Sequence, residues 1–125
     1  MAVTVTSFGY LHGPTPAAHI VLDLRHHFRD PHINPALREL TADDAAVRAA
    51  VLDTPGIRPL VIRTAAVVGA YQAGPTPGPV SVAVGCAGGR HRAPTVAAAL
   101  ARLLCIRGLE VTVTHRDLHR PVINR

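Results

Sequence analysis

The stretch "VAVGCAGGRHRAPTVAAAL", residues 82–100, decides the fold. It runs from a short apolar segment through a glycine turn with three basic residues into a longer apolar segment. Pro94 suits the first turn of a helix, where a missing N–H removes no hydrogen bond. Gly108 occupies the C′ position at which helices often end. The pattern predicts a strand over 81–86 that is joined by a basic glycine loop to a helix over 94–107.

Three more strands and two more helices are predicted around this unit. The strands are 3–8, 19–24 and 110–115, and the helices run from Thr41 to about Leu52 and from Pro55 to about Tyr71. Thr41 with Asp43 and Asp44 is typical of a capped helix start.

The segment 19–24 is continuously apolar, which is typical of a buried strand. Residues 25–40 are predicted to form a long irregular stretch, and 74–79 a break. Strands that alternate with helices favour an α/β domain with a mostly parallel sheet of about four strands. The helices are expected to pack on that sheet, and the single domain to span residues 1–125.

The composition excludes several classes of protein. The chain has 125 residues, of which 48% are hydrophobic and 17% charged, as expected of a globular domain. No segment approaches the roughly 18 apolar residues that span a bilayer, and no basic segment precedes an apolar run at the N-terminus. We therefore expect a cytoplasmic protein without membrane contact. Cys86 and Cys105 are expected as free thiols, because a helix separates them.

The charge of the chain is strongly positive. The net charge is +5, and all thirteen basic residues are arginine. Codon usage in a GC-rich genome explains their number, whereas phosphate binding by the planar guanidinium explains their positions. Both explanations stay open at this point.

Polar clusters follow three predicted strands. They cover residues 23–26, 86–92 and 115–117. Ligands of open α/β sheets bind beyond the carboxyl ends of the strands. Parallel strands would bring the three clusters to one edge, and this edge is the predicted binding site.

The central cluster is suited to an anion. Gly88 and Gly89 allow a tight turn that exposes main-chain N–H groups, and the following helix directs its positive end toward the same place. Arg90, His91 and Arg92 add charge and donors. A plain glycine turn is the alternative. The chain contains no lysine, hence no P-loop, and no G-x-G-x-x-G motif, so nothing supports nucleotide-dependent catalysis.

An enzymatic alternative rests on the spacing of Cys86 and Arg92. C-x5-R is the loop spacing of cysteine-dependent phosphatases, in which a thiolate attacks phosphorus. Gly85 replaces the usual preceding histidine and Ala93 the following serine or threonine. The general acid would be Asp30 or Asp117. No H-x3-H or C-x2-C pair occurs, so no structural metal is expected. His32, in the loop between two prolines, is a candidate pocket donor.

With these residues in view, the chain resembles the carboxy-terminal domain of the RapZ (YvcJ-like) RNase adapter family. The resemblance is carried by SFGYLHGPTPAAHIVLDLR (7–25), DPHINPALRELTADD (30–44), VSVAVGCAGGRHRAPTVAAALA (80–101) and RGLEVTVTHRDL (107–118). Family members usually carry an amino-terminal kinase-like domain with a Walker A loop, which this sequence lacks. Ala87, Ala93 and Asp30 depart from the Thr, Ser and Asn of the family pattern.

The resemblance implies a non-catalytic sensor or adapter that needs no cofactor. It implies binding of a phosphorylated small molecule, such as the amino sugar phosphate glucosamine-6-phosphate, and of small regulatory RNAs. The implied ligand residues are Cys86, Ala87, Gly88, Gly89, Arg90, His91 and Arg92 around the phosphate, with Arg25, His32, His115 and Arg116 around the sugar. The basic tail from Arg116 to Arg125 would contact RNA phosphates. The oligomeric state stays open, with a homo-oligomer among the alternatives.

Overall fold

A computed structural model describes residues 2–123, and its core is a four-stranded sheet. The strands are β1 (Ala2–Gly9), β2 (Ile20–Asp23), β3 (Val80–Cys86) and β4 (Glu110–His115); the helices are η1 (Tyr10–His12), η2 (Pro31–Ile33), α1 (Pro35–Arg38), α2 (Ala45–Leu52), α3 (Ile57–Gln72) and α4 (Arg92–Ile106). The strand order is β2-β3-β1-β4, and every neighbouring pair is parallel. The predicted α/β class with a parallel sheet is confirmed.

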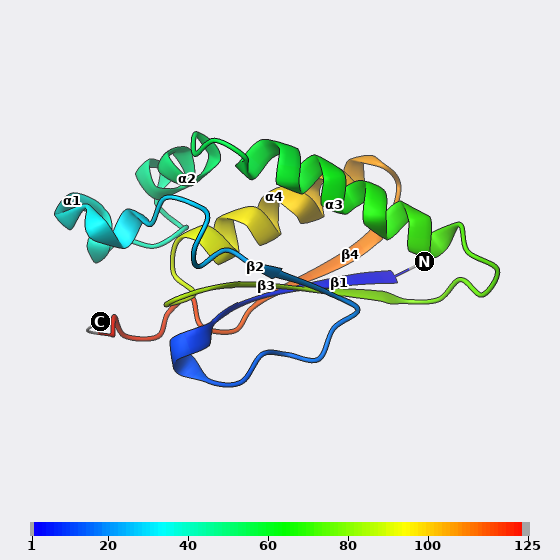
Figure 1. Cartoon of the computed structure of the whole chain (residues 1–125), viewed down its shortest axis with the longest axis horizontal. Helices are drawn as coiled ribbons and strands as arrows, with labels where there is room; N and C mark the ends of the chain where they lie inside the picture. The colour runs from blue at the N-terminus through cyan, green and yellow to red at the C-terminus, as the bar shows by residue number, and fades with distance from the viewer. Residues whose placement is uncertain (1, 124–125) are drawn as a thin grey trace.

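The helices lie on one face of the sheet. Figure 1 shows α2, α3 and α4 above the strands, while the segment that leads from β1 through η1 to β2 crosses the opposite face. α4 contacts β1, β3 and β4 on one side and α2 and α3 on the other. This central position explains why most of its residues are buried, from Arg92 to Leu104.

The core forms between this helical layer and the two central strands. Val5 of β1 and Val82 of β3 are opposite each other in the register, and both are buried. Leu100 and Leu104 of α4 are fully buried in the same cluster. Burial of one such side chain stabilises the fold by about 1.5–3 kcal/mol. The strand–loop–helix unit that opened the sequence analysis thus supplies the centre of the core.

The prediction of a buried second strand is wrong. β2 lies at the edge of the sheet, where it pairs only with β3, and Val21 is 44% exposed. A continuous apolar run suggests helices on both faces, but here the helices cover one face only.

The stretch 25–40 was predicted to be irregular, yet it contains η2 and α1. Asp30 caps the first by accepting a hydrogen bond from the His32 N–H, and Asn34 caps the second by accepting one from the Ala36 N–H. A proline follows each cap at the first helical position. The prolines therefore start short helices here instead of breaking regular secondary structure.

The other helix boundaries differ from the predicted ones by a few residues. α2 begins at Ala45 after Asp44, α3 at Ile57 rather than Pro55, and α4 at Arg92 rather than Pro94. α4 ends as predicted before Gly108, which adopts φ 88°. None of the helices in residues 2–123 combines the length and the apolar character that crossing a membrane requires.

Candidate functional site

The carboxyl ends of all the strands meet at one edge of the sheet. In the parallel registers Gly9 of β1 is opposite Cys86 of β3, and Asp23 of β2 is opposite Gly85. His115 at the end of β4 is opposite Ser7. The predicted convergence of the three polar clusters is therefore confirmed, and it follows from the parallel direction of the strands.

The loop between β3 and α4 folds tightly against the end of β1. Gly89 adopts φ 75°, a left-handed conformation that favours glycine. A Cβ atom on Gly9 would lie 2.4 Å from the carbonyl carbon of Gly88, so no side chain fits there. The main-chain N–H of Leu11 donates to the Ala87 carbonyl at 3.1 Å. Two glycines from distant parts of the chain thus fix the path of the loop.

This loop presents hydrogen-bond donors without acceptors. Within residues 2–123, no group accepts a hydrogen bond from the main-chain N–H groups of residues 88–91. The Nε–H groups of Arg90 and Arg92 are also buried without a partner in this part of the chain. α4 begins at the same place and adds the positive end of its dipole. Unpaired donors around a helix N-terminus form a site for an anion.

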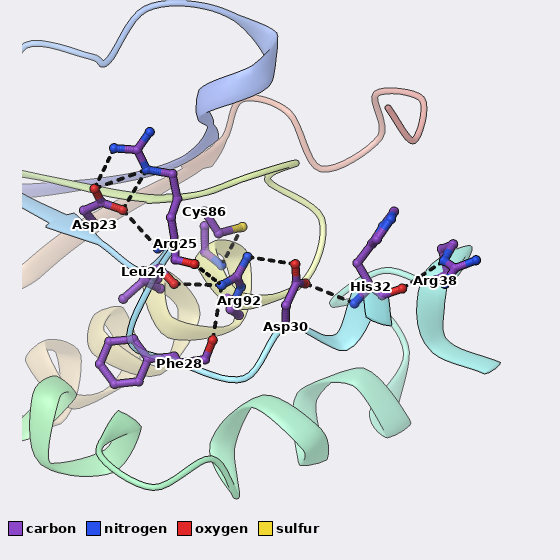
Figure 2. Close-up of polar contacts among 10 residues, drawn as sticks. Asp23, Leu24, Arg25, Phe28, Asp30, His32, Arg38, Cys86 and Arg92 are labelled. Atoms are coloured by element: carbon purple, nitrogen blue, oxygen red, sulfur yellow. Dashed lines mark hydrogen bonds and ion pairs between the residues drawn. The ribbon is translucent and has the colours of Figure 1, made fainter. Parts of the chain in front are cut away.

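Arg92 is the most enclosed of the basic residues. Its Nη1 donates to the carbonyl oxygens of Leu24 at 2.8 Å and Arg25 at 3.1 Å, and a longer contact of 3.3 Å reaches that of Phe28. Its Nη2 lies 3.2 Å from the Asp30 carboxylate (Figure 2). Arg92 therefore ties the chain after β2 to the start of α4, and only its Nε lacks a partner.

Arg90 and His91 also make contacts within the protein. The two Nη atoms of Arg90 donate to the carbonyl oxygens of Arg120 at 2.7 Å and Glu39 at 2.9 Å. His91 Nε2 lies 2.8 Å from the Leu40 carbonyl oxygen. Because a carbonyl only accepts, Nε2 carries the proton. Burial lowers the pKa of His91, so this ring is neutral at neutral pH.

A pocket opens in front of the loop. Six predicted site residues line it: His32, Cys86, Gly88, Arg90, His91 and Arg92. Leu11, Asp30, Val122 and Ile123 complete the lining. Its empty space is about 310 Å³, including the part open to solvent. Its lining combines the basic residues of the loop with the apolar side chains of Leu11, Val122 and Ile123.

The remaining predicted residues do not line this pocket. The guanidinium carbon of Arg25 lies 3.6 Å from the centre of the Tyr10 ring. Arg25 also forms a bidentate pair with Asp23 (Figure 2). Hydrogen bonds from Arg25 lower the pKa of Asp23 to about 2. Ala87 and Gly89 shape the loop, as described above.

His115, the last residue of β4, and Arg116, which follows it, support the sheet edge. His115 Nδ1 lies 2.6 Å from Ser7 Oγ, and burial lowers the pKa of the ring. Arg116 donates to the Pro14 carbonyl at 2.6 Å and pairs with Asp117 at 2.9 Å. Asp117 is fully buried, and it also accepts a hydrogen bond from the Gly9 N–H at 2.8 Å.

Cys86 closes the floor of the pocket. It is buried, and its Sγ accepts a hydrogen bond from the Ala93 N–H at 3.4 Å. Cys105 is exposed near the far end of α4. Within residues 2–123, no three His, Cys, Asp or Glu side chains come together as a metal site would require.

Sequence reasoning missed the apolar side of the pocket. Leu11 comes from η1, whereas Val122 and Ile123 come from the tail that was assigned to RNA. No local sequence pattern marks these three residues as part of a pocket. The structure also makes Asp30, which was a candidate general acid, the carboxylate partner of Arg92.

Comparisons with known proteins agree with this architecture. Residues 1–119 match the family described as RapZ C-terminal domain. Relatives named nucleotide-binding protein occur in Streptomyces coelicolor, with 37% identity over 96% of this chain, and in Salinispora tropica, with 41% identity over 96%. A relative of the same name in Rhodospirillum rubrum is 38% identical over 94% of the chain. The chain spans about two fifths of the length of these relatives: 41%, 40% and 38%.

Proposed function

The chain belongs to the RapZ C-terminal domain family, and from this premise we propose that it is a regulatory domain that binds a phosphorylated small molecule in the loop 86–92. The observation that carries the proposal is the set of unpaired donors: four successive main-chain N–H groups and the buried Nε atoms of Arg90 and Arg92. A phosphate supplies several acceptor oxygens in a small volume, and it would satisfy these groups together.

An amino sugar phosphate such as glucosamine-6-phosphate is the ligand we favour. No Phe, Tyr or Trp side chain lines the pocket within residues 2–123, so a nucleobase could stack only on the imidazole rings of His32 or His91. The word nucleotide in the names of the relatives refers to those longer proteins.

RNA binding receives less support from the described residues. The tail residues Arg116 and Arg120 both pair with the buried carboxylate of Asp117, at 2.9 and 3.1 Å. Their charge is therefore partly compensated. If RNA binds through several phosphates, its affinity should fall by roughly tenfold or more between 50 and 200 mM salt, unlike that of a pocket ligand.

A thermal-shift titration tests the proposal. The panel comprises glucosamine-6-phosphate, glucose-6-phosphate, unphosphorylated glucosamine and inorganic phosphate. A ligand at 100 times its Kd should stabilise the fold by about 2.7 kcal/mol. We expect the phosphorylated compounds to raise the melting temperature and glucosamine to leave it unchanged.

The matched variants are Gly88→Ala and Gly78→Ala. A Cβ at either position meets nothing within 4 Å, so both proteins should fold. Only Gly88 lines the pocket. Gly88→Ala should weaken the thermal shift while Gly78→Ala retains it. Equal shifts in both variants, or no shift with any phosphorylated compound, would refute phosphate binding at this loop.

A further inference from the structure

We infer, on the basis of the proposed function, that the C-terminal residues Val122 and Ile123 form a specificity wall that selects organic phosphate esters over inorganic phosphate. Both residues are half-buried, and they line the same pocket as Arg90, His91 and Arg92. Leu11 lines it as well and is 46% exposed. We call these three residues the apolar wall.

The wall is attached to the phosphate loop from both ends. Leu11 is held by its N–H, which donates to the Ala87 carbonyl at 3.1 Å. The tail is held by Arg90, whose Nη1 donates to the Arg120 carbonyl at 2.7 Å. Arg90 therefore acts as a positioning residue that links the tail to the loop.

A second anchor fixes the tail just before the wall. Arg120 Nε lies 3.1 Å from the Asp117 carboxylate, and the Arg120 N–H donates to the Asp117 carbonyl at 3.1 Å. Asp117 itself is fully buried at the sheet edge. The tail is thus fixed to the body of the domain at Arg120, two residues before Val122.

The two sides of the pocket would recognise different parts of a ligand. Inorganic phosphate has only oxygens and would use the donors of the loop. A phosphate ester also carries a carbon framework, and its C–H surface would be removed from water against the wall. The wall therefore adds affinity for the ester alone and separates the two ligands.

Calorimetric titrations of the full chain test this inference. The probes are inorganic phosphate and glucose-6-phosphate, and the variants are Ile123→Ser and Val122→Ser. The matched control is Ile106→Ser, because Ile106 is 72% exposed at the end of α4 and does not line the pocket. Thermal melts of all four proteins report whether each variant folds.

We expect each wall variant to lose roughly tenfold in affinity for glucose-6-phosphate, which corresponds to about 1.4 kcal/mol, and to bind inorganic phosphate within about twofold of the original chain. Ile106→Ser should change neither affinity. Equal losses for both probes, or no loss for either, would overturn the wall. If the original chain binds neither probe, the proposed function fails and this inference fails with it. If the original chain binds both probes and the variants keep the same ratio of the two affinities, only the specificity wall is wrong.

Discussion

Arg92 and Asp30 form an ion pair beneath the pocket, with Nη2 3.2 Å from the carboxylate. The Arg92 side chain is buried, and its Nη1 is surrounded by carbonyl oxygens of the chain that follows β2. The pair joins the first residue of α4 to the cap of η2. Arg92 therefore maintains the architecture of the pocket as well as lining it.

Replacing this arginine should destabilise the fold. Arg92→Ala removes three hydrogen bonds to main-chain carbonyls and the ion pair with Asp30, so we expect a loss of about 3 kcal/mol in the free energy of unfolding. Arg92→Lys should recover only part of the loss, because an ammonium cannot reproduce the planar fork. Urea unfolding measures both variants. Wild-type stability in Arg92→Ala would show that these contacts contribute little to the fold.

The contact between Gly9 and the loop predicts a strong steric effect. A Cβ on Gly9 would lie 2.4 Å from the Gly88 carbonyl carbon and 2.6 Å from its oxygen, and both are main-chain atoms. Gly9→Ala should therefore lower the free energy of unfolding by about 2–3 kcal/mol. Gly88→Ala, which meets nothing within 4 Å, should stay within about 0.5 kcal/mol. Thermal melts compare the two variants, and equal melting temperatures would contradict the predicted steric effect at Gly9.

The environment of Asp117 predicts that the fold loses stability in acid. Burial alone would raise its pKa, but hydrogen bonds from Arg116 and from the Gly9 N–H outweigh burial and hold the pKa below its usual value. A depressed folded-state pKa contributes stability above about pH 3.9 that is lost as the pH falls through the folded pKa.

Asp117→Asn should accordingly be less stable at neutral pH and should lose this part of the acid dependence. Urea midpoints between pH 7 and pH 2 measure both effects. Parallel profiles for the variant and the original chain would contradict the assigned role. Asp53→Asn is a suitable control, because its long contact with Arg58, at 3.8 Å, joins two exposed side chains.

The burial of His91 predicts a second loss of stability, at a milder acidity than that of Asp117. Burial lowers the pKa of His91, so the unfolded chain binds the proton more readily than the folded one. Stability should be complete above about pH 6.5 and should decline as the pH falls toward the lower folded pKa. His91→Gln keeps an N–H donor for Leu40 without a titrating ring, and its decline should be shallower. A wild-type stability that stays constant from pH 7.5 to pH 5 would contradict this account.

Cys86 separates the binding role from the phosphatase alternative. Its thiol is buried and accepts the Ala93 N–H, and Arg92 is engaged with Asp30. We expect Cys86→Ser to keep the thermal shift with sugar phosphates, and we expect no hydrolysis of p-nitrophenyl phosphate by the original chain. Turnover that disappears in Cys86→Ser would establish the phosphatase instead.

The strand–loop–helix unit and the parallel sheet were predictable because they depend on local patterns: alternation, a proline in a first helical turn and a glycine at the C′ position. The exposed edge position of β2 was not predictable, because the composition of a strand does not reveal which faces of the sheet the helices cover. The site shows the same division. The loop 86–92 was predictable because it lies between a strand pattern and a helix pattern in the sequence. Leu11, Val122 and Ile123 reach the pocket only through the tertiary fold, which leaves no local sequence pattern.

The roles of individual arginines were also beyond the sequence. Arg25, Arg92 and Arg116 all follow strands or open a helix, and sequence alone assigned all three to the ligand. In the structure Arg25 pairs with Asp23, Arg92 with Asp30 and Arg116 with Asp117. Whether a guanidinium faces a ligand or a carboxylate depends on the acid that the fold places beside it.

The most direct test of the central claim is a titration of the ¹⁵N-labelled chain with glucosamine-6-phosphate, followed by the amide resonances of residues 88–91. We predict that these amide protons move downfield together and saturate, because each would gain a phosphate oxygen as acceptor, while the amides of Gly69 and Gly78 remain in place. Unchanged resonances in the loop at saturating ligand, whatever moves elsewhere, would contradict the claim that this loop holds the phosphate.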